Sequence, residues 1–167
     1  MHTSDNGFLL GEWRLFDKRL MHEPSIRVPL LMRYPKTIKA GAQCDRMVLN
    51  LDLAPTLLDL AGVRPPEWMQ GRSAVPLLQG REAGWRNDWL YEYFEYPAVH
   101  MVRKNRGIRT DRYKLIHYFE PPEEFELYDL ERDPEERHNL WGDPQYKELT
   151  TQLQRRLEEL RHETGEI

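Results

Sequence analysis

The sequence predicts an α/β fold, in which a strand-then-helix portion is followed by a small antiparallel sheet with a helix packed on it. Three observations lead to this prediction. An apolar run over 28–34 precedes a leucine-rich helical pattern over 50–61, aromatic and β-branched runs recur between 89 and 128, and a helical apolar stripe covers 144–163. The change of texture near residue 85 divides the chain into predicted domains 1–85 and 86–167.

The first predicted elements are a loop and a buried strand. Residues 7–23 mix glycines, charges and isolated aromatic side chains, and Pro24 is expected to interrupt any helix, so this stretch is predicted as a loop with short helical turns. The run from Val28 to Tyr34 is apolar and bracketed by Pro29 and Pro35, which is typical of a buried strand of the parallel-sheet type.

The next predicted element is a helix from Asn50 to Ala61. Leucines recur along it, Asp52 is the expected N-cap, and Gly62 stands just past its end. A strand followed by a helix is the order typical of α/β proteins.

The C-terminal half is predicted as a sheet and one long helix. Runs at 89–96, 107–109, 113–119 and 125–128 indicate antiparallel strands, and the triplet 110–112 is short enough for a hairpin turn. Asp143 is the expected N-cap of a final amphipathic helix over 144–163, with Pro144 at its first position and Gly165 after its end.

Composition excludes several classes of protein. The chain has 167 residues, 40% apolar and 31% charged, which fits a globular domain. Its net charge of −4 argues against general nucleic-acid binding, and no apolar run is long enough for a membrane span. The single cysteine, Cys44, excludes an internal disulfide and a multi-cysteine metal site. No secretory signal is expected on this chain, its abrupt opening suggests that upstream sequence is missing, and the compartment is left open.

Charged residues gather in two neighbouring runs. Half of residues 103–114 are basic and half of residues 120–137 are acidic. Because strands that neighbour in sequence often pair, we expect these charges to pair across strands, with a rim for an anionic substrate as the alternative.

Two features near the N-terminus offer chemistry. Asp5 and Asn6 are adjacent hard oxygen donors of the kind that Ca²⁺ or Mg²⁺ prefers, although these residues taken alone favour an Asx turn at Gly7. Lys18 is a cation that can hold a tetrahedral anion, the alternative being a surface lysine paired with Asp17.

The sequence contains a series of ordered blocks. They are Thr3–Glu12, Asp17–Arg19, Ser25–Leu30, Asp52–Gly62, Gln70–Ser73, Arg109–Ile116 and Glu126–Leu130. Together these blocks resemble the C-terminal half of a type I sulfatase of the alkaline phosphatase superfamily, in the N-sulphoglucosamine sulphohydrolase and N-acetylglucosamine-6-sulfatase-like branch. The resemblance covers essentially the whole chain.

This resemblance implies a role for particular residues. It implies that Asp5 and Asn6 ligate a calcium ion, that Lys18 contacts the sulfate group, and that His100 approaches the sugar of a sulfated carbohydrate substrate. It also implies that residues 1–85 end a sulfatase catalytic α/β domain whose N-terminal part is missing, and that 86–167 form the family's small C-terminal domain. Members of the family are usually exported.

One departure from the family concerns the nucleophile. Family members carry a Cys/Ser-x-Pro-x-Arg motif whose first residue becomes formylglycine, whereas Cys44 here lacks the required proline and no serine supplies the motif. Trp13 also stands where the family commonly has histidine. Three hypotheses follow: the C-terminal part of a sulfatase acting on sulfate esters or sulfamates, a catalytically inactive binding or complementing module, and a phosphatase or phosphonate hydrolase of the same superfamily.

Overall fold

The computed structural model describes residues 1–97, 99 and 101–165. They form two compact units, each described here by itself. The first, the short-helix unit, contains Met1–Asp5 and Pro29–Asn87, and the second, the sheet unit, contains Asn6–Val28 and the chain from Asp88 onward. Residues 6–28 therefore pack with the sheet. The domain limits 1–85 and 86–167 stay a prediction.

The sheet unit contains the predicted antiparallel sheet. Its strands are β3 (Asp88–Tyr93), β4 (Asn105–Thr110), β5 (Tyr113–Tyr118) and β6 (Glu124–Asp129), paired in that order. Every neighbouring pair is antiparallel, and β4 turns into β5 through residues 111–112 as the short triplet predicted. The fold class is thus confirmed for this half of the chain.

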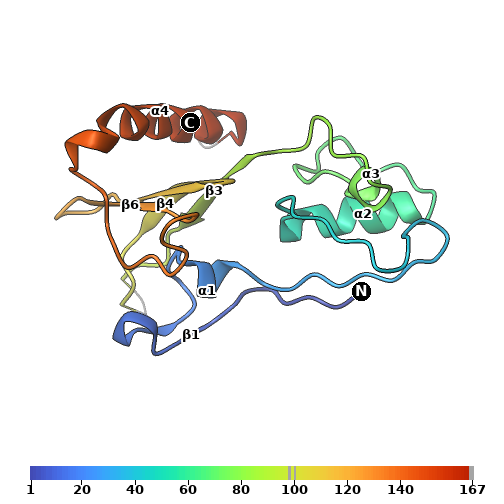
Figure 1. The fold of residues 1–167 in the computed structure, drawn as a ribbon, viewed down its shortest axis with the longest axis horizontal. Coiled ribbons are helices and arrows are strands. Elements are labelled where there is room, and N and C mark those ends of the chain that lie inside the picture. The colour runs from blue at the N-terminus through green and yellow to red at the C-terminus, as the bar shows by residue number, and fades with distance from the viewer. Residues whose placement is uncertain (98, 100, 166–167) are drawn as a thin grey trace. The chain divides into compact units, whose positions relative to one another are not determined.

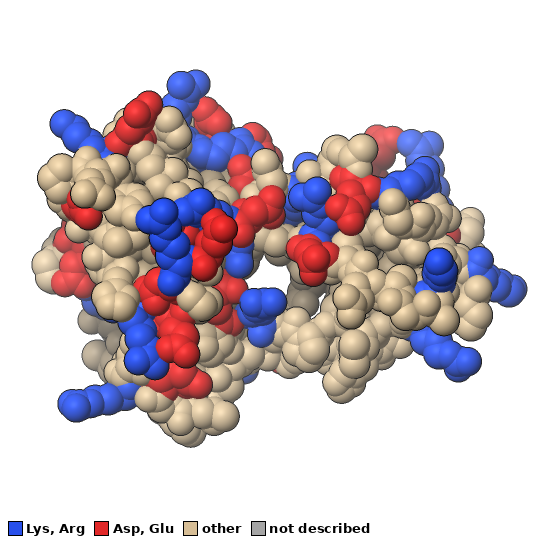
Figure 2. Space-filling model, viewed as in Figure 1, with Lys and Arg blue, Asp and Glu red and all other residues tan. Residues whose placement is uncertain are grey.

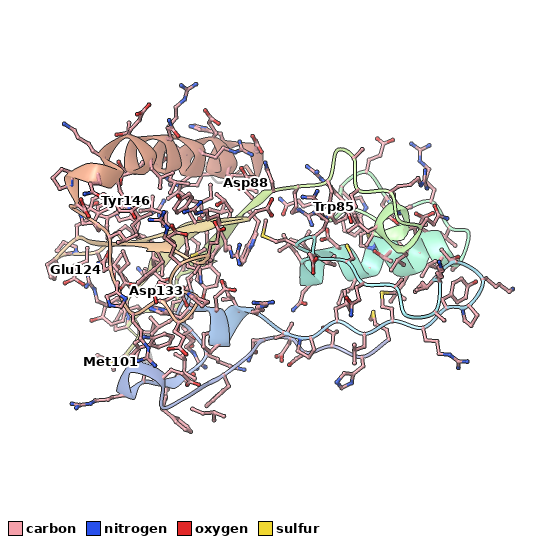
Figure 3. All side chains as sticks on the ribbon, viewed as in Figure 1. Trp85, Asp88, Met101, Glu124, Asp133 and Tyr146 are labelled. Carbon is pink, nitrogen blue, oxygen red and sulfur yellow. The ribbon has the colours of Figure 1, made fainter. Side chains whose placement is uncertain are left out.

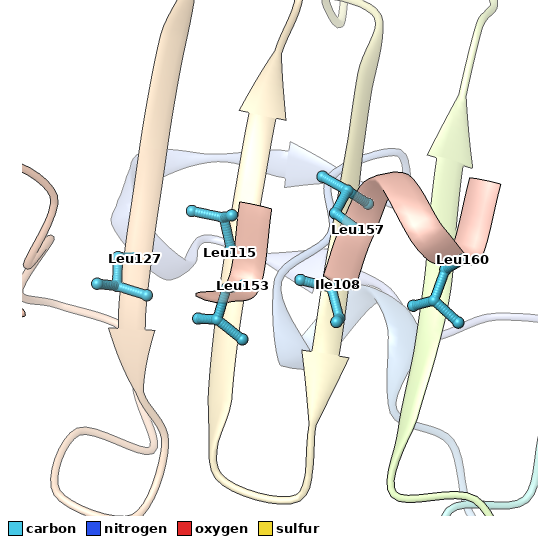
Figure 4. Close-up of a cluster of buried hydrophobic side chains, with 6 residues drawn as sticks. All are labelled: Ile108, Leu115, Leu127, Leu153, Leu157 and Leu160. Carbon is cyan, nitrogen blue, oxygen red and sulfur yellow. The ribbon is translucent and has the colours of Figure 1, made fainter. Parts of the chain in front are cut away.

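The predicted C-terminal helix covers one face of the sheet. A 3₁₀ turn, η3 (Pro144–Tyr146), leads into α4 (Lys147–Glu163), and the Asp143 carboxylate accepts the N–H of Gln145 at 2.9 Å. Figure 4 shows leucines of α4 facing apolar side chains of the sheet. The buried cluster consists of Ile108, Leu115, Leu127, Leu153, Leu157 and Leu160. Burial of each such side chain stabilises the fold by about 1.5–3 kcal/mol.

The opposite face of the sheet is covered by residues 6–28, as Figure 1 shows for α1 and β1. This segment contains β1 (Leu9–Leu10), η1 (Glu12–Arg14), β2 (Phe16–Asp17) and α1 (Glu23–Ile26). It packs Met21 against Ile116, Tyr118 and Tyr128. Gly107 makes this approach possible, since a Cβ there would lie 2.4 Å from the Met21 sulfur.

The prediction that Pro24 interrupts a helix was wrong in detail. Pro24 lies in the first turn of α1, where its missing N–H has no helical partner to lose. Residues 7–23 also form the antiparallel pair β1 and β2 rather than loop alone.

The short-helix unit contains the second predicted helix. It begins as a 3₁₀ turn, η2 (Asn50–Asp52), continues as α2 (Leu53–Leu60), and is followed by α3 (Val75–Leu78). Gly62 adopts φ +76 after the helix, as its predicted position requires. Asp52 is not a side-chain N-cap of α2. Its buried carboxylate accepts the N–H groups of Leu49 and Arg72 and binds the Arg86 guanidinium.

The predicted parallel strand at 28–34 does not form. Within these residues only Leu31 makes a β-bridge, with His2, through N–H to O distances of 2.8 and 2.9 Å. A buried parallel strand needs ladder partners along its length, and no other described segment pairs with this one. The composition of the run was therefore insufficient to define a strand.

In the part of the chain that the structure describes, no helix is both long and apolar enough to cross a membrane.

Candidate functional site

Lys18 and Asn6 lie together in the sheet unit. The Lys18 Nζ donates to the Asn6 Oδ1 at 3.1 Å, and the Asn6 amide nitrogen donates to the Gly7 carbonyl at 2.6 Å. Both side chains are partly buried. The Lys18 ammonium thus lies beside the amide oxygen of Asn6, twelve residues earlier in the sequence.

The backbone around both residues is tied to α1. The Gly7 N–H donates to the Ser25 carbonyl at 2.8 Å, and the Ser25 hydroxyl donates to the Lys18 carbonyl at 2.5 Å. Gly7 is required at its position, because a Cβ would lie 2.0 Å from the Pro24 carbonyl oxygen. The close approach of these segments explains a glycine that the Asx-turn interpretation treated only as a turn residue.

Asp5 belongs to the short-helix unit. Its side chain is exposed and accepts the Ser4 hydroxyl at 3.3 Å, while its carbonyl accepts the Asn50 amide at 2.6 Å. The chain therefore offers an exposed carboxylate at Asp5 and an amide oxygen at Asn6 in consecutive residues.

These donors fit part of a calcium site. Carboxylate and amide oxygens are the ligands that Ca²⁺ prefers, but the ion takes six to eight oxygens. Among the described residues no group of three or more His, Cys, Asp or Glu side chains is placed to hold a metal. The oxygen types of Asp5 and Asn6 suit calcium, and their assignment as ligands stays a prediction.

The prediction for His100 lies outside the described residues. The alternative for Lys18 was a surface lysine paired with Asp17. The Lys18 backbone N–H, rather than its ammonium, donates to the Asp17 carboxylate at 2.7 Å. That carboxylate also binds Arg19.

The expected pairing of the two charged runs is present. Arg103 binds Glu124 at 2.7 Å and Lys104 binds Glu120 at 2.8 Å. Figure 2 shows basic and acidic side chains interleaved on the visible face, in keeping with mutual neutralisation.

Sequence reasoning missed a buried ionic cluster beneath the sheet. Lys114 is fully buried, and its Nζ lies 2.6 Å from Glu136 and 2.9 Å from Glu23. Arg109 Nε lies 3.2 Å from the same Glu23 carboxylate. Strand alternation contained the signal, because Lys114 shares a face of β5 with the buried Ile116.

Burial and charge shift the pKa values in this region. Burial alone would raise the pKa of Glu23, but Lys114 and Arg109 outweigh it and hold that pKa below its ordinary value. Burial raises the pKa of Glu136, offset in part by Lys114. Burial also lowers the pKa of His22 to about 4, with Lys114 adding to the effect. The His22 ring lies 4.7 Å from the Trp13 ring, so Trp13 packs on this cluster.

A family model described as N-sulphoglucosamine sulphohydrolase, C-terminal, matches residues 11–163. An N-acetylglucosamine-6-O-sulfatase of Bacteroides thetaiotaomicron is 46% identical over 162 residues, which make up 95% of this chain and 29% of that protein. Human arylsulfatase K is 32% identical over 164 residues, 94% of this chain and 30% of that protein. The chain thus spans under a third of the length of these relatives.

Solved structures show the same fold. One, a protein in complex with its substrate D-glucosamine-2-N,6-O-disulfate, matches with a TM-score of 0.94 and 44% identity over 98% of this chain and 34% of that chain. A phosphonate monoester hydrolase of Agrobacterium radiobacter matches with a TM-score of 0.82 and 28% identity, over 97% of this chain and 34% of that one. The fold of this chain is therefore shared with a phosphonate monoester hydrolase as well as with a sulfated-glucosamine complex.

Proposed function

The chain belongs to the N-sulphoglucosamine sulphohydrolase C-terminal family, the C-terminal part of a sulfatase, and from this premise we propose that it serves a sulfatase acting on sulfate esters or sulfamates of sugars. The Bacteroides thetaiotaomicron relative and human arylsulfatase K are sulfatases, and one similar protein was solved with a sulfated glucosamine. The substrate class of this chain is taken from them.

The observation that carries this function is the contact between Lys18 and Asn6. A lysine ammonium is a compact point charge suited to a tetrahedral anion, and its 3.1 Å contact with the Asn6 oxygen places it beside a candidate calcium ligand. Lys18 would bind a sulfate oxygen and stabilise the negative charge that develops on it during hydrolysis. The Asn6 side-chain oxygen accepts a hydrogen bond from one of the three ammonium N–H groups of Lys18 and thereby orients the ammonium.

Calcium and formylglycine belong to this proposal as groups supplied in the complete enzyme. When bound, they would provide charge neutralisation and the nucleophile that attacks sulfur. Asp5 and Asn6 would contribute carboxylate and amide ligands to the calcium ion. The nucleophile motif and the remaining ligands would belong to an N-terminal sulfatase portion, the expected partner of this chain.

A fusion enzyme tests the proposal. The segment of the Bacteroides thetaiotaomicron N-acetylglucosamine-6-O-sulfatase that matches this chain is replaced by it, and sulfate release from N-acetylglucosamine 6-sulfate is measured. We expect turnover by the fusion and none by this chain alone. A folded fusion with no turnover would favour the inactive binding or complementing module.

A second substrate separates the remaining alternative. The similarity to a phosphonate monoester hydrolase makes phosphonate hydrolysis the competing function. A phosphonate monoester is therefore offered to the same fusion. Faster turnover of the phosphonate than of the sulfate ester would contradict the sulfatase assignment.

The calcium ligands are tested by binding as well as by activity. Asn6→Ala in the fusion should weaken calcium binding measured by isothermal titration calorimetry, because one oxygen ligand is lost. Asp45→Ala, which alters an exposed carboxylate, is the matched control. Equal calcium affinity in both variants would remove Asn6 from the ligand set.

A further inference from the structure

We propose that the buried cluster of Glu23, Lys114 and Glu136 is a positioning device that fixes Asn6 and Lys18 on the sheet. Its meaning for catalysis rests on the proposed function of Lys18. Its effect on the backbone does not, so the two can be tested apart. The proposed role of these three residues involves no contact with substrate, so they are positioning residues.

Glu23 is bound through both its side chain and its backbone N–H. Its carboxylate lies 2.9 Å from Lys114 Nζ and 3.2 Å from Arg109 Nε. Its backbone N–H donates to the Glu136 Oε2 at 2.7 Å, while the Glu136 Oε1 accepts from Lys114 at 2.6 Å. Side chain and backbone of one residue are thus fixed by strands β4 and β5 and by the turn after β6.

Helix α1 connects Glu23 to the backbone of Lys18. Glu23 begins α1, and Ser25 in the same short helix donates its hydroxyl to the Lys18 carbonyl. The carbonyls of Pro24 and Ser25 accept the N–H groups of Phe8 and Gly7 at 2.9 and 2.8 Å. A displacement of α1 would therefore move the backbone on both sides of the Asn6–Lys18 contact.

A further tie comes from the edge of the sheet. The Tyr91 hydroxyl in β3 donates to the Arg19 carbonyl at 3.1 Å, one residue beyond Lys18. Met21 then fills the space over Gly107. The segment is therefore held at its middle by apolar packing and at α1 by charge.

Buried ion pairs restrict the position of a segment more strictly than apolar packing does. Apolar contacts are non-directional, so packing by Met21 alone would tolerate sliding of a four-residue helix. Buried charges tolerate little displacement, because a misplaced ion loses its partner without regaining water. Glu136 adopts φ +53, a left-handed conformation unusual for glutamate, and its side chain is buried.

Hydrogen exchange of the 167-residue chain tests this inference without any substrate. Glu136→Gln replaces one of the two carboxylate oxygens by an amide NH₂ group, so either Lys114 or the Glu23 N–H loses its acceptor on residue 136. We expect the amides of Gly7 and Phe8 to exchange about tenfold faster or more, with the amide of Ile116 in β5 unchanged.

The matched control removes an ion pair on the other face of the sheet. Asp88, labelled in Figure 3 near α4, binds Arg156 at 2.7 Å. Asp88→Asn should leave the exchange of Gly7 and Phe8 unchanged. Equal acceleration in both variants, or none in Glu136→Gln, would overturn the inference. If the Ile116 amide also exchanges faster in Glu136→Gln, hydrogen exchange is measured in Glu136→Asp. Equal acceleration of every amide in Glu136→Asp would also overturn the inference.

A catalytic readout comes from the fusion enzyme described above. Glu136→Gln should lower kcat/KM by about tenfold in the parent and by much less when Lys18 is already methionine, because both changes disturb the same contact. Multiplicative losses would contradict positioning through Lys18. If Lys18→Met itself has no effect, the proposed function fails while the exchange result still decides the inference about positioning.

Discussion

Protonation of the buried His22 should make the sheet unit unstable in acid. Its side chain is 7% exposed, and its pKa of about 4 is below the ordinary 6.5 because of burial and Lys114. The other ionisable groups near it are Glu23 and Glu126, the latter 3.6 Å from the His22 Nε2. Between the two pKa values the unfolded chain binds a proton that the folded chain does not, so stability falls as pH falls.

The magnitude follows from the width of that interval. Each pH unit below 6.5 costs 1.36 kcal/mol until the folded pKa is reached, so lowering the pH from 7 to 5 should cost about 2 kcal/mol through this group. His22→Gln removes the titration and should flatten the pH dependence by that amount. Burial raises the pKa values of Glu126 and Glu136, which opposes the effect of His22 but is present in both proteins.

Urea unfolding followed by far-ultraviolet circular dichroism measures the effect, since the 17-residue α4 reports on the sheet unit. Stability is compared at pH 7 and pH 5 for the wild type, His22→Gln and the control His138→Gln, whose side chain is 79% exposed. A pH dependence of His22→Gln equal to that of the wild type would refute the reasoning.

Three further variants test the packing, each by urea unfolding of the 167-residue chain. Gly107→Ala should destabilise the sheet unit by about 1–3 kcal/mol, because the new methyl group would overlap Met21; an unchanged midpoint would contradict this. Leu157→Ala should cost about 2–5 kcal/mol by opening a cavity beneath α4, and a loss below 1 kcal/mol would count against the described core. Asn139→Ala should cost about 1–3 kcal/mol, since its Oδ1 accepts the Leu127 N–H at the edge of β6, and hydrogen exchange at Leu127 should rise with it.

The sequence predicted the C-terminal half well because its signals are local. The leucines of α4 repeat at helical spacing and need only one apolar surface to pack on, which the strands provide. The turn at 110–112 likewise fixes the neighbouring strands as a hairpin. These elements depend little on contacts from distant parts of the chain.

The run at 28–34 and the buried ions depend on distant partners, and there local reasoning failed. Apolar character alone does not distinguish a strand from extended chain, since a strand exists only where a ladder forms. The role of Glu23 depends on Lys114 and Glu136, which lie far from it in sequence. Pairing within 103–137 was predictable, but the entry of a third segment into the cluster was not.

The candidate site was visible in the sequence only through hard oxygens, one lysine and the resemblance to sulfatases. Composition alone favoured the interpretation of Lys18 as a surface lysine paired with Asp17. The structure brings its ammonium to Asn6, a contact between residues in different short elements that spacing alone could not predict. The assignments to calcium and sulfate stay predictions.

The most direct test of the central claim compares Lys18→Met with Lys147→Met in the fusion enzyme. Lys147, at the start of α4, is an exposed lysine of the same unit and matches the change in charge. If Lys18 contacts the sulfate, its replacement should lower kcat/KM for N-acetylglucosamine 6-sulfate by about 10²–10³-fold, as expected for loss of one group that stabilises developing charge. Lys147→Met should leave the rate unchanged. Equal rates for the two variants would contradict the account.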